Sequence, residues 1–183
     1  MTTDFNLSRY ARGSMVLHWL MALLIVAMYA LINVADVFER GSEARALSKY
    51  WHFCLGLTVF VLVWLRIVLR IIYPVPPIVP VPAPWQNKAA KAGHLLLYVL
   101  MVAMPLLGWL VLSAKGRAIP FYGFELPALI GADKPLGRQL MDLHSLGGNV
   151  GYFLMGGHAA VALWHHYRMK DNTLLRMLPG RKA

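Results

Sequence analysis

Five of the seven histidines lie inside long apolar segments, and His144 and His158 stand fourteen residues apart in one of them. Histidine within a membrane-type segment is costly and usually marks a functional site. Fourteen residues is close to four helical turns, so on a helix both rings point to nearly the same side, about 21 Å apart along the axis. Because imidazole is a common metal ligand, this spacing predicts two cofactors stacked across a membrane.

The donor types favour haem over a bare metal ion. Zinc, copper and nickel sites usually recruit carboxylate or cysteine as well as imidazole, and apart from the lone Cys54 neither type stands deep in the apolar segments. The single cysteine, Cys54, excludes an intrachain disulfide and a Cys-x-x-Cys-His haem attachment. Two histidines per site, without carboxylate or thiolate, are typical of b-type haem.

The composition requires a membrane around these histidines. The chain is 58% hydrophobic and 14% charged, whereas an ordinary soluble domain has about 25% charged residues. A net charge of +10 would suggest nucleic acid in a soluble protein, but here the charges cluster between apolar runs. They are therefore interpreted as flanks of membrane helices, and no nucleic-acid partner is expected.

Four apolar segments are long enough to cross a bilayer, which takes about 20 residues. The sequence predicts one domain over residues 1–183, with transmembrane helices at about 13–35, 47–72, 92–114 and 140–167. The first segment is too long for a signal peptide and lacks a cleavage site, so it is expected to be retained. The predicted fold class is all-α, an integral membrane four-helix bundle binding two b-type haems.

The lysines and arginines predict the orientation of the bundle. With the N-terminus inside, the inner segments hold eleven of them and the outer segments seven. The inner set is Arg9, Arg12, Arg66, Arg70, Lys88, Lys91, Arg168, Lys170, Arg176, Arg181 and Lys182. Both termini are therefore predicted to be cytoplasmic.

Two connections between the predicted helices have a distinctive composition. The prolines of PVPPIVPVPAP, residues 74–84, forbid helix and predict an extended, stiff connection. The prolines would also fit an SH3-domain ligand, but this alternative is less favoured because the segment is tethered at both ends. The outer connection at 116–141 contains the apolar stretch FYGFELPALIG, which we expect either on the membrane surface or over the end of the bundle.

Helix direction gives each histidine a depth in the membrane. His52 and His144 form a predicted outer pair, His18 and His158 form an inner pair, and His94 is an additional inner histidine. One intramembrane histidine could equally serve as a hydrogen-bonding residue, but four at two matched depths favour haem ligands. The residue four positions after each of these four is small: Ala22, Gly56, Gly148 and Ala162.

Small residues at these positions would leave room beside each ligand, because side chains four apart lie over one another on a helix. After His94 the corresponding residue is the large Tyr98, which sets His94 apart from the ligands. The glycines of the fourth segment have a second interpretation as contacts for close helix packing, and both uses are expected.

His165 and His166 stand at the inner end of the fourth segment and leave two alternatives open. They are polar residues that end the helix at the interface, or they are protonatable groups near the inner haem. Histidine titrates near neutral pH and could donate protons to a reduced quinone. His94 and His165 are the candidates for that second role.

Four stretches of the sequence carry a resemblance to a known family. They are HWLMALL at 18–24, RIVLRIIYPVPPIVP at 66–80, GHLLLYVLMVAMPLLGW at 93–109, and HSLGGNVGYFLMGGHAAVALWHHYRMKDNTLLRMLP at 144–179. Together they resemble the prokaryotic cytochrome b561 family over nearly the whole chain, and the last stretch is the most specific. The resemblance implies two b-type haems with His18 and His158 as inner ligands and His52 and His144 as outer ligands.

Within that family the chain looks most like the superoxide oxidases of the bacterial inner membrane, which pass electrons from superoxide to ubiquinone. The resemblance implies quinone contacts near His94 and His165 and a cationic outer surface that attracts superoxide. Candidates for that surface are Arg45, Lys49, Lys115 and Arg117, although acidic residues share the loop that holds Arg45.

The main alternative is a cytochrome b electron-transfer subunit that links a quinone pool to another redox partner. An alternative from another class is a small membrane transporter or assembly protein without haem. The absence of a b-type absorption spectrum would favour that last alternative.

Overall fold

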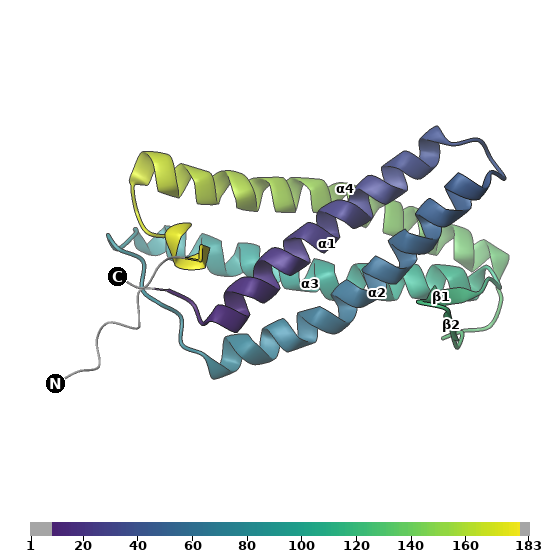
Figure 1. Ribbon diagram of the computed structural model, residues 1–183, viewed down its shortest axis with the longest axis horizontal. Coiled ribbons are helices and arrows are strands. Elements are labelled where there is room, and N and C mark those ends of the chain that lie inside the picture. The colour runs from purple at the N-terminus through teal and green to yellow at the C-terminus, as the bar shows by residue number, and fades with distance from the viewer. Residues whose placement is uncertain (1–8, 180–183) are drawn as a thin grey trace.

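The computed structural model describes residues 9–179, which form four long α-helices and a small β-hairpin (Figure 1). The elements are α1 (Arg12–Val37), α2 (Glu43–Ile72), α3 (Pro84–Ala114), β1 (Ile119–Phe121), β2 (Phe124–Leu126), α4 (Lys134–Trp164), the π-helix η1 (His165–Met169) and the 3₁₀-helix η2 (Leu175–Met177). Arg181 and Lys182, which the charge count includes, lie outside the described residues.

Capping residues and a proline, rather than the apolar runs, mark where α2, α3 and α4 begin. The Ser42 hydroxyl accepts a hydrogen bond from the Arg45 backbone N–H at the start of α2, and Asp133 does the same for Leu136 at the start of α4. Pro84 occupies the first turn of α3, where its missing N–H costs nothing. As a result α3 and α4 begin several residues before the predicted spans at 92 and 140.

The connection before α3 contains no helix or strand from residue 73 to residue 83, as the prolines predicted, but Pro84, the last residue of the predicted connection, begins α3. The connection between α3 and α4, predicted to be an outer one, contains the hairpin, which the all-α prediction missed. Tyr122 and Gly123 adopt positive φ angles of 48° and 86° at its turn, as a tight two-residue hairpin turn requires. The Tyr122 hydroxyl lies 2.9 Å from that of Thr58, so the hairpin is seated against α2.

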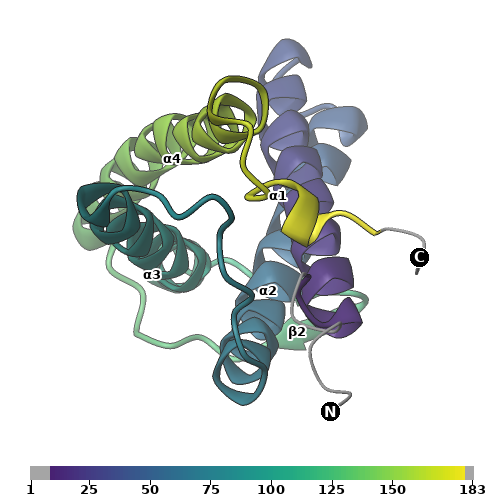
Figure 2. The same ribbon diagram turned by 90° about the vertical axis from the view of Figure 1, so that its left-hand side faces the viewer.

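The bundle consists of two helix pairs, α1 with α2 and α3 with α4, and Figure 2 shows the two pairs separated along one side. A buried cluster of Leu17, Met21, Val59 and Val63 joins α1 to α2. On the open side, α1 reaches α4 through a tyrosine, whose hydroxyl donates a hydrogen bond to a backbone carbonyl: Tyr29 to Gly148, 3.0 Å. Because α1 and α4 do not pack directly against each other, a space remains between the two helix pairs.

Within the described residues, three helices are long and apolar enough to cross a membrane: α1, α2 and α3. The fourth, α4, has a lower hydropathy because its inward face carries polar side chains such as Ser145 and Asn149. Its outward face is apolar, since Phe153 is 82% exposed, much like Ile71 on α2 at 78%. The exposed apolar side chains on the outward faces of all four helices fit contact with lipid. That α4 crosses the membrane stays a prediction.

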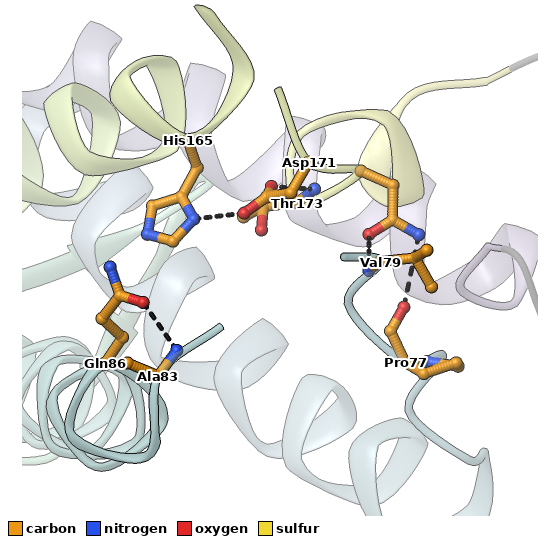
Figure 3. A network of polar contacts seen from close by, with 8 residues as sticks. Pro77, Val79, Ala83, Gln86, His165, Asp171 and Thr173 are labelled. Carbon is orange, nitrogen blue, oxygen red and sulfur yellow. Dashed lines mark hydrogen bonds and ion pairs between the residues drawn. The ribbon is translucent and has the colours of Figure 1, made fainter. Parts of the chain in front are cut away.

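The segment after α4 folds back over one end of the bundle. Asn172 exchanges hydrogen bonds with the backbone of Val79, and the Trp19 indole N–H donates to the carbonyl of Met177 at 2.7 Å. Figure 3 shows this segment beside Pro77 and Val79 of the proline-rich connection. The C-terminal segment thus fastens α1 and the connection between α2 and α3 to the end of α4.

Candidate functional site

A cavity of about 880 Å³ lies between the two helix pairs and is lined by residues of all four long helices. Pockets that bind small molecules and cofactors typically measure about 300–1,000 Å³, so this one is at the large end. One end is lined by Arg66, Arg70 and Arg176, which the charge count assigns to the inner side. The opposite end, predicted to be the outer one, is lined by cationic residues of α2 and of the segment after α3, and by Asp36 of α1.

Both histidine pairs predicted from the sequence face each other across this cavity. The ring centroids of His52 on α2 and His144 on α4 are 6.3 Å apart. Those of His18 on α1 and His158 on α4 are 6.2 Å apart. The four-turn spacing on α4 therefore places one ring opposite α2 and the other opposite α1.

These separations fit one metal atom between the two rings of each pair. A metal–imidazole bond is about 2.0 Å and a ring nitrogen lies about 1.1 Å from the ring centre, so two rings on opposite sides of a metal have centroids about 6.2 Å apart. Nδ1 of His52 is 3.0 Å from the carbonyl oxygen of Met28, to which it donates. Such a bond leaves Nε2 as the metal-binding nitrogen.

The ligand sets suit a macrocycle better than a bare ion. Among the described residues, no group of three or more histidine, cysteine, aspartate or glutamate side chains is arranged to hold a metal ion. A haem needs only two axial ligands from the protein, because the porphyrin supplies the other four. The residues present therefore fit haem at both pairs.

Space for a flat group beside each histidine comes from the four small residues noted in the sequence, all of which line the cavity: Ala22, Gly56, Gly148 and Ala162. A Cβ added at Gly148 would meet nothing within 4 Å, so this glycine faces open space. Gly147 and Gly151 differ, because a Cβ there would collide with Met104 and with Tyr29. Close packing is thus observed at Gly147 and Gly151, and Gly148 leaves open space, so its use for cofactor clearance stays a prediction.

His94 lies on the cavity wall, and its ring centroid is 5.5 Å from that of His158. His165 is placed differently: it is buried, and it does not line this cavity. Its Nδ1–H donates to Oδ2 of Asp171 at 2.5 Å, as Figure 3 shows. Of the two quinone candidates, only His94 is brought to the cavity, and a quinone role for His165 stays a prediction.

The His165 contact also determines the state of Asp171, a carboxylate in the C-terminal segment. Burial alone would raise the pKa of Asp171, but hydrogen bonds from His165 and Thr173 outweigh burial and hold the pKa below its ordinary value. Asp171 is therefore a charged, fully engaged hydrogen-bond acceptor at neutral pH, and it orients the buried imidazole of His165.

At the predicted outer end, three of the four candidates for attracting superoxide line the cavity: Lys49, Lys115 and Arg117. Arg45 does not, because its guanidinium is 2.8 Å from the carboxylate of Asp36 and also donates to the carbonyl of Phe38. The acidic residue that the sequence placed in this loop thus offsets Arg45 and leaves the other three cations at the cavity mouth.

Comparison with known proteins assigns the chain to a family. Residues 9–180 match the family described as prokaryotic cytochrome b561. The chain belongs to the prokaryotic cytochrome b561 family. This confirms the resemblance carried by the four sequence stretches, and it identifies the protein as a prokaryotic membrane cytochrome in a family that binds b-type haem and transfers electrons.

Three relatives of this cytochrome cover nearly its whole length. Cytochrome b561 homolog 1 of Escherichia coli (strain K12) is 36% identical over 96% of the chain and 100% of its own length. A probable superoxide oxidase CybB of Yersinia pestis is also 36% identical, over 96% of the chain and 98% of its own length. Cytochrome b562 of Cereibacter sphaeroides is 30% identical over 94% of the chain and 96% of its own length.

One residue beside the histidine pairs of this cytochrome was missed by sequence reasoning. A Cβ added at Gly108 of α3 would lie 3.2 Å from Cε1 of His144. This contact is tighter than an ordinary van der Waals contact, so any larger residue would require the ring to shift. The sequence contained no signal for this role, because Gly108 is far from His144 along the chain and becomes its neighbour only when α3 packs on α4.

Proposed function

We propose that this cytochrome b561 is a di-haem oxidoreductase that takes electrons from superoxide at the outer side of the bacterial inner membrane and delivers them to ubiquinone. The observation that carries the proposal is the presence of two histidine pairs, with centroids 6.2 and 6.3 Å apart, in one cavity with a cationic mouth. The relative named as a probable superoxide oxidase supports the choice of electron donor.

In this proposal His18 and His158 hold the inner haem b, and His52 and His144 hold the outer one. When bound, these haems supply one-electron transfer across the membrane. The chain's own contribution begins with orientation. The carbonyl of Met28 fixes the ring of His52 by accepting its Nδ1–H.

The two ends of the cavity have different proposed roles. At the outer end, Lys49, Lys115 and Arg117 raise the local concentration of a small anion such as superoxide. In the inner half, His94 carries a titratable ring nitrogen from which a reduced ubiquinone can receive a proton. The inner side is cytoplasmic, with both termini there, on the basis of the lysine and arginine distribution.

Mixing the oxidised cytochrome with pulses of superoxide tests this function. We expect the haems to become reduced faster than superoxide dismutates spontaneously, and added superoxide dismutase should abolish the reduction. An intact haem spectrum without reduction by superoxide would instead support a cytochrome b subunit that receives electrons from another redox partner.

Removing the charges of Lys115 and Arg117 should slow the reaction with superoxide. Electrostatic steering raises association rates by about 10–1,000-fold, so we expect the double variant Lys115→Gln/Arg117→Gln to react about tenfold more slowly at low salt. The difference should shrink as salt screens the charges. Stopped-flow reduction at several ionic strengths measures both effects.

The matched control is Lys134→Gln, because Lys134 is an exposed lysine of α4 that does not line the cavity. Its rate should equal that of the unmodified protein. Equal slowing by Lys134→Gln, or a loss that persists at high salt, would contradict steering by the cavity mouth.

Gly108→Ala should disturb the outer haem site selectively. The added methyl group would lie 3.2 Å from the His144 ring, which must move to accommodate it. We expect the redox titration to show a shifted potential or partial loss of one haem while the other is unchanged. Gly93→Ala is the control on the same helix, because a Cβ there meets nothing within 4 Å, and an equal effect of both variants would refute the contact argument.

A further inference from the structure

Three arginines gather at the inner end of the cavity, where the proposed electron path has no use for them. Arg66 and Arg70 come from α2 and Arg176 comes from η2, and all three line the cavity wall. Arg176 is only 7% exposed. Its Nη1 donates to the carbonyl of Pro76, but its Nε is buried without a hydrogen-bond partner among the described residues.

The positive charge of this cluster is not balanced by the acidic side chain beside it. The guanidinium carbons of Arg70 and Arg176 both lie 5.6 Å from the ring centroid of Tyr10, so one ring holds two like charges. Asp171 is the acidic group whose charge acts on Arg176, and its carboxylate accepts hydrogen bonds from His165 and Thr173. Within the described residues, the arginines exceed the acids at this end of the cavity.

Such a cluster has the chemistry of an oxyanion site. A buried guanidinium with an unsatisfied N–H is costly unless a partner binds it. The planar fork of arginine matches carboxylate and phosphate oxygens, and hydrogen bonds to such anions are about twice as strong as neutral ones. Arg176 lines a cavity large enough to bring such an anion to its guanidinium, whose buried Nε has no hydrogen-bond partner among the described residues.

We propose that Arg66, Arg70 and Arg176 bind the propionate carboxylates of the haem held between His18 and His158. The inference rests on the proposed haem sites. Carboxylates from inside the cavity are favoured over phosphates of the surrounding lipid because Arg176 is almost fully buried and shares the cavity with this histidine pair. Arg66 lines the same cavity as His18 and His158.

The arginines would offset the negative charge of the propionates and thereby favour the reduced haem. The test uses purified, haem-loaded Arg176→Gln, with Arg176→Lys as the conservative variant. We expect Arg176→Gln to lower the midpoint potential of one haem and leave the other unchanged. Its propionate vibrations in resonance Raman spectra should shift, and haem transfer to apomyoglobin should be about tenfold faster, as expected for one lost charged hydrogen bond. Arg176→Lys should fall between Arg176→Gln and the unmodified protein.

Arg168→Gln is the matched control, because Arg168 is exposed on η1 and does not line the cavity. It should match the unmodified protein in all three measurements. If Arg176→Gln does not fold, Arg66→Gln at a half-buried position provides the same readouts. Unchanged potentials, Raman bands and haem transfer in a folded variant would overturn the proposal.

A second arm distinguishes the two sources of an oxyanion. The unmodified protein is compared in nanodiscs with and without anionic lipid, and we expect its inner-haem potential and propionate bands to be the same in both. If removal of anionic lipid reproduces the Arg176→Gln changes, the anion is a lipid phosphate and the proposal is wrong. Failure of the haem proposal itself would appear separately, as a protein without any b-type spectrum.

Discussion

Replacing His144 with alanine should remove one haem and leave the other in place. The variant breaks the outer pair, in which the rings of His52 and His144 are 6.3 Å apart, but the pair of His18 and His158 remains intact. The haem-to-protein ratio should fall by half, and a redox titration should lose one of two components. His158→Ala is the matched variant on the same helix, and it should remove the other component.

The pairing also requires that the two histidines of one pair affect the same haem. Variants that merely destabilise the fold would not show this pattern. His52→Ala must remove the same component as His144→Ala, and His18→Ala the same component as His158→Ala. His166→Ala changes a histidine near the end of the same helix that is in neither pair, so it should retain both haems. Loss of both haems from every variant, or matching spectra for His52→Ala and His158→Ala, would contradict the pairing.

Replacing His94 with glutamine should preserve both haems but slow ubiquinone reduction. Glutamine still forms hydrogen bonds, but it has no ring nitrogen that can take up a proton and pass it on. Losing a positioned general acid costs about 100- to 10,000-fold in rate. The rate at which ubiquinone re-oxidises the pre-reduced haems measures this loss, and the haem content of the same sample shows whether the ligands are intact.

Tyr98→Phe is the control for the His94 variant, because Tyr98 stands one turn further along α3 and lines the same cavity. It should reduce ubiquinone at the rate of the unmodified protein. A different result is conceivable because the ring of His94 is only 5.5 Å from that of His158, close enough for the two to share a metal. If His94→Gln loses a haem, then His94 is an axial ligand and the role assigned to His18 is wrong.

The histidine arrangement could be anticipated from sequence because it depends on regular helix geometry. Spacing on α4 sets the relative directions of His144 and His158, and the order of the helices through the membrane gives each histidine its depth. The small residues one turn after each histidine follow from the same periodicity, and the structure places Ala22 and Gly148 on the cavity wall as expected. These features need no knowledge of how distant segments pack.

Features that depend on contacts between distant segments could not be anticipated in this way. The hairpin is seated by Thr58, more than sixty residues from its partner Tyr122. Gly108 matters only because α3 approaches the His144 ring. His165 is a similar case. It stands seven residues after His158, about two helical turns, so a continuous α-helix would place both rings on the same face. The change from α-helix to π-helix and the bond to Asp171 place that ring away from the cavity lining instead.

The haem content of the purified chain tests the central claim most directly. A reduced-minus-oxidised spectrum combined with a haem-to-protein ratio measures the type and the number of haems in one sample. Two histidine pairs in one cavity predict two b-type haems per chain. One haem per chain would remove a pair from the account, and a protein purified from haem-replete cells without a b-type spectrum would contradict it entirely.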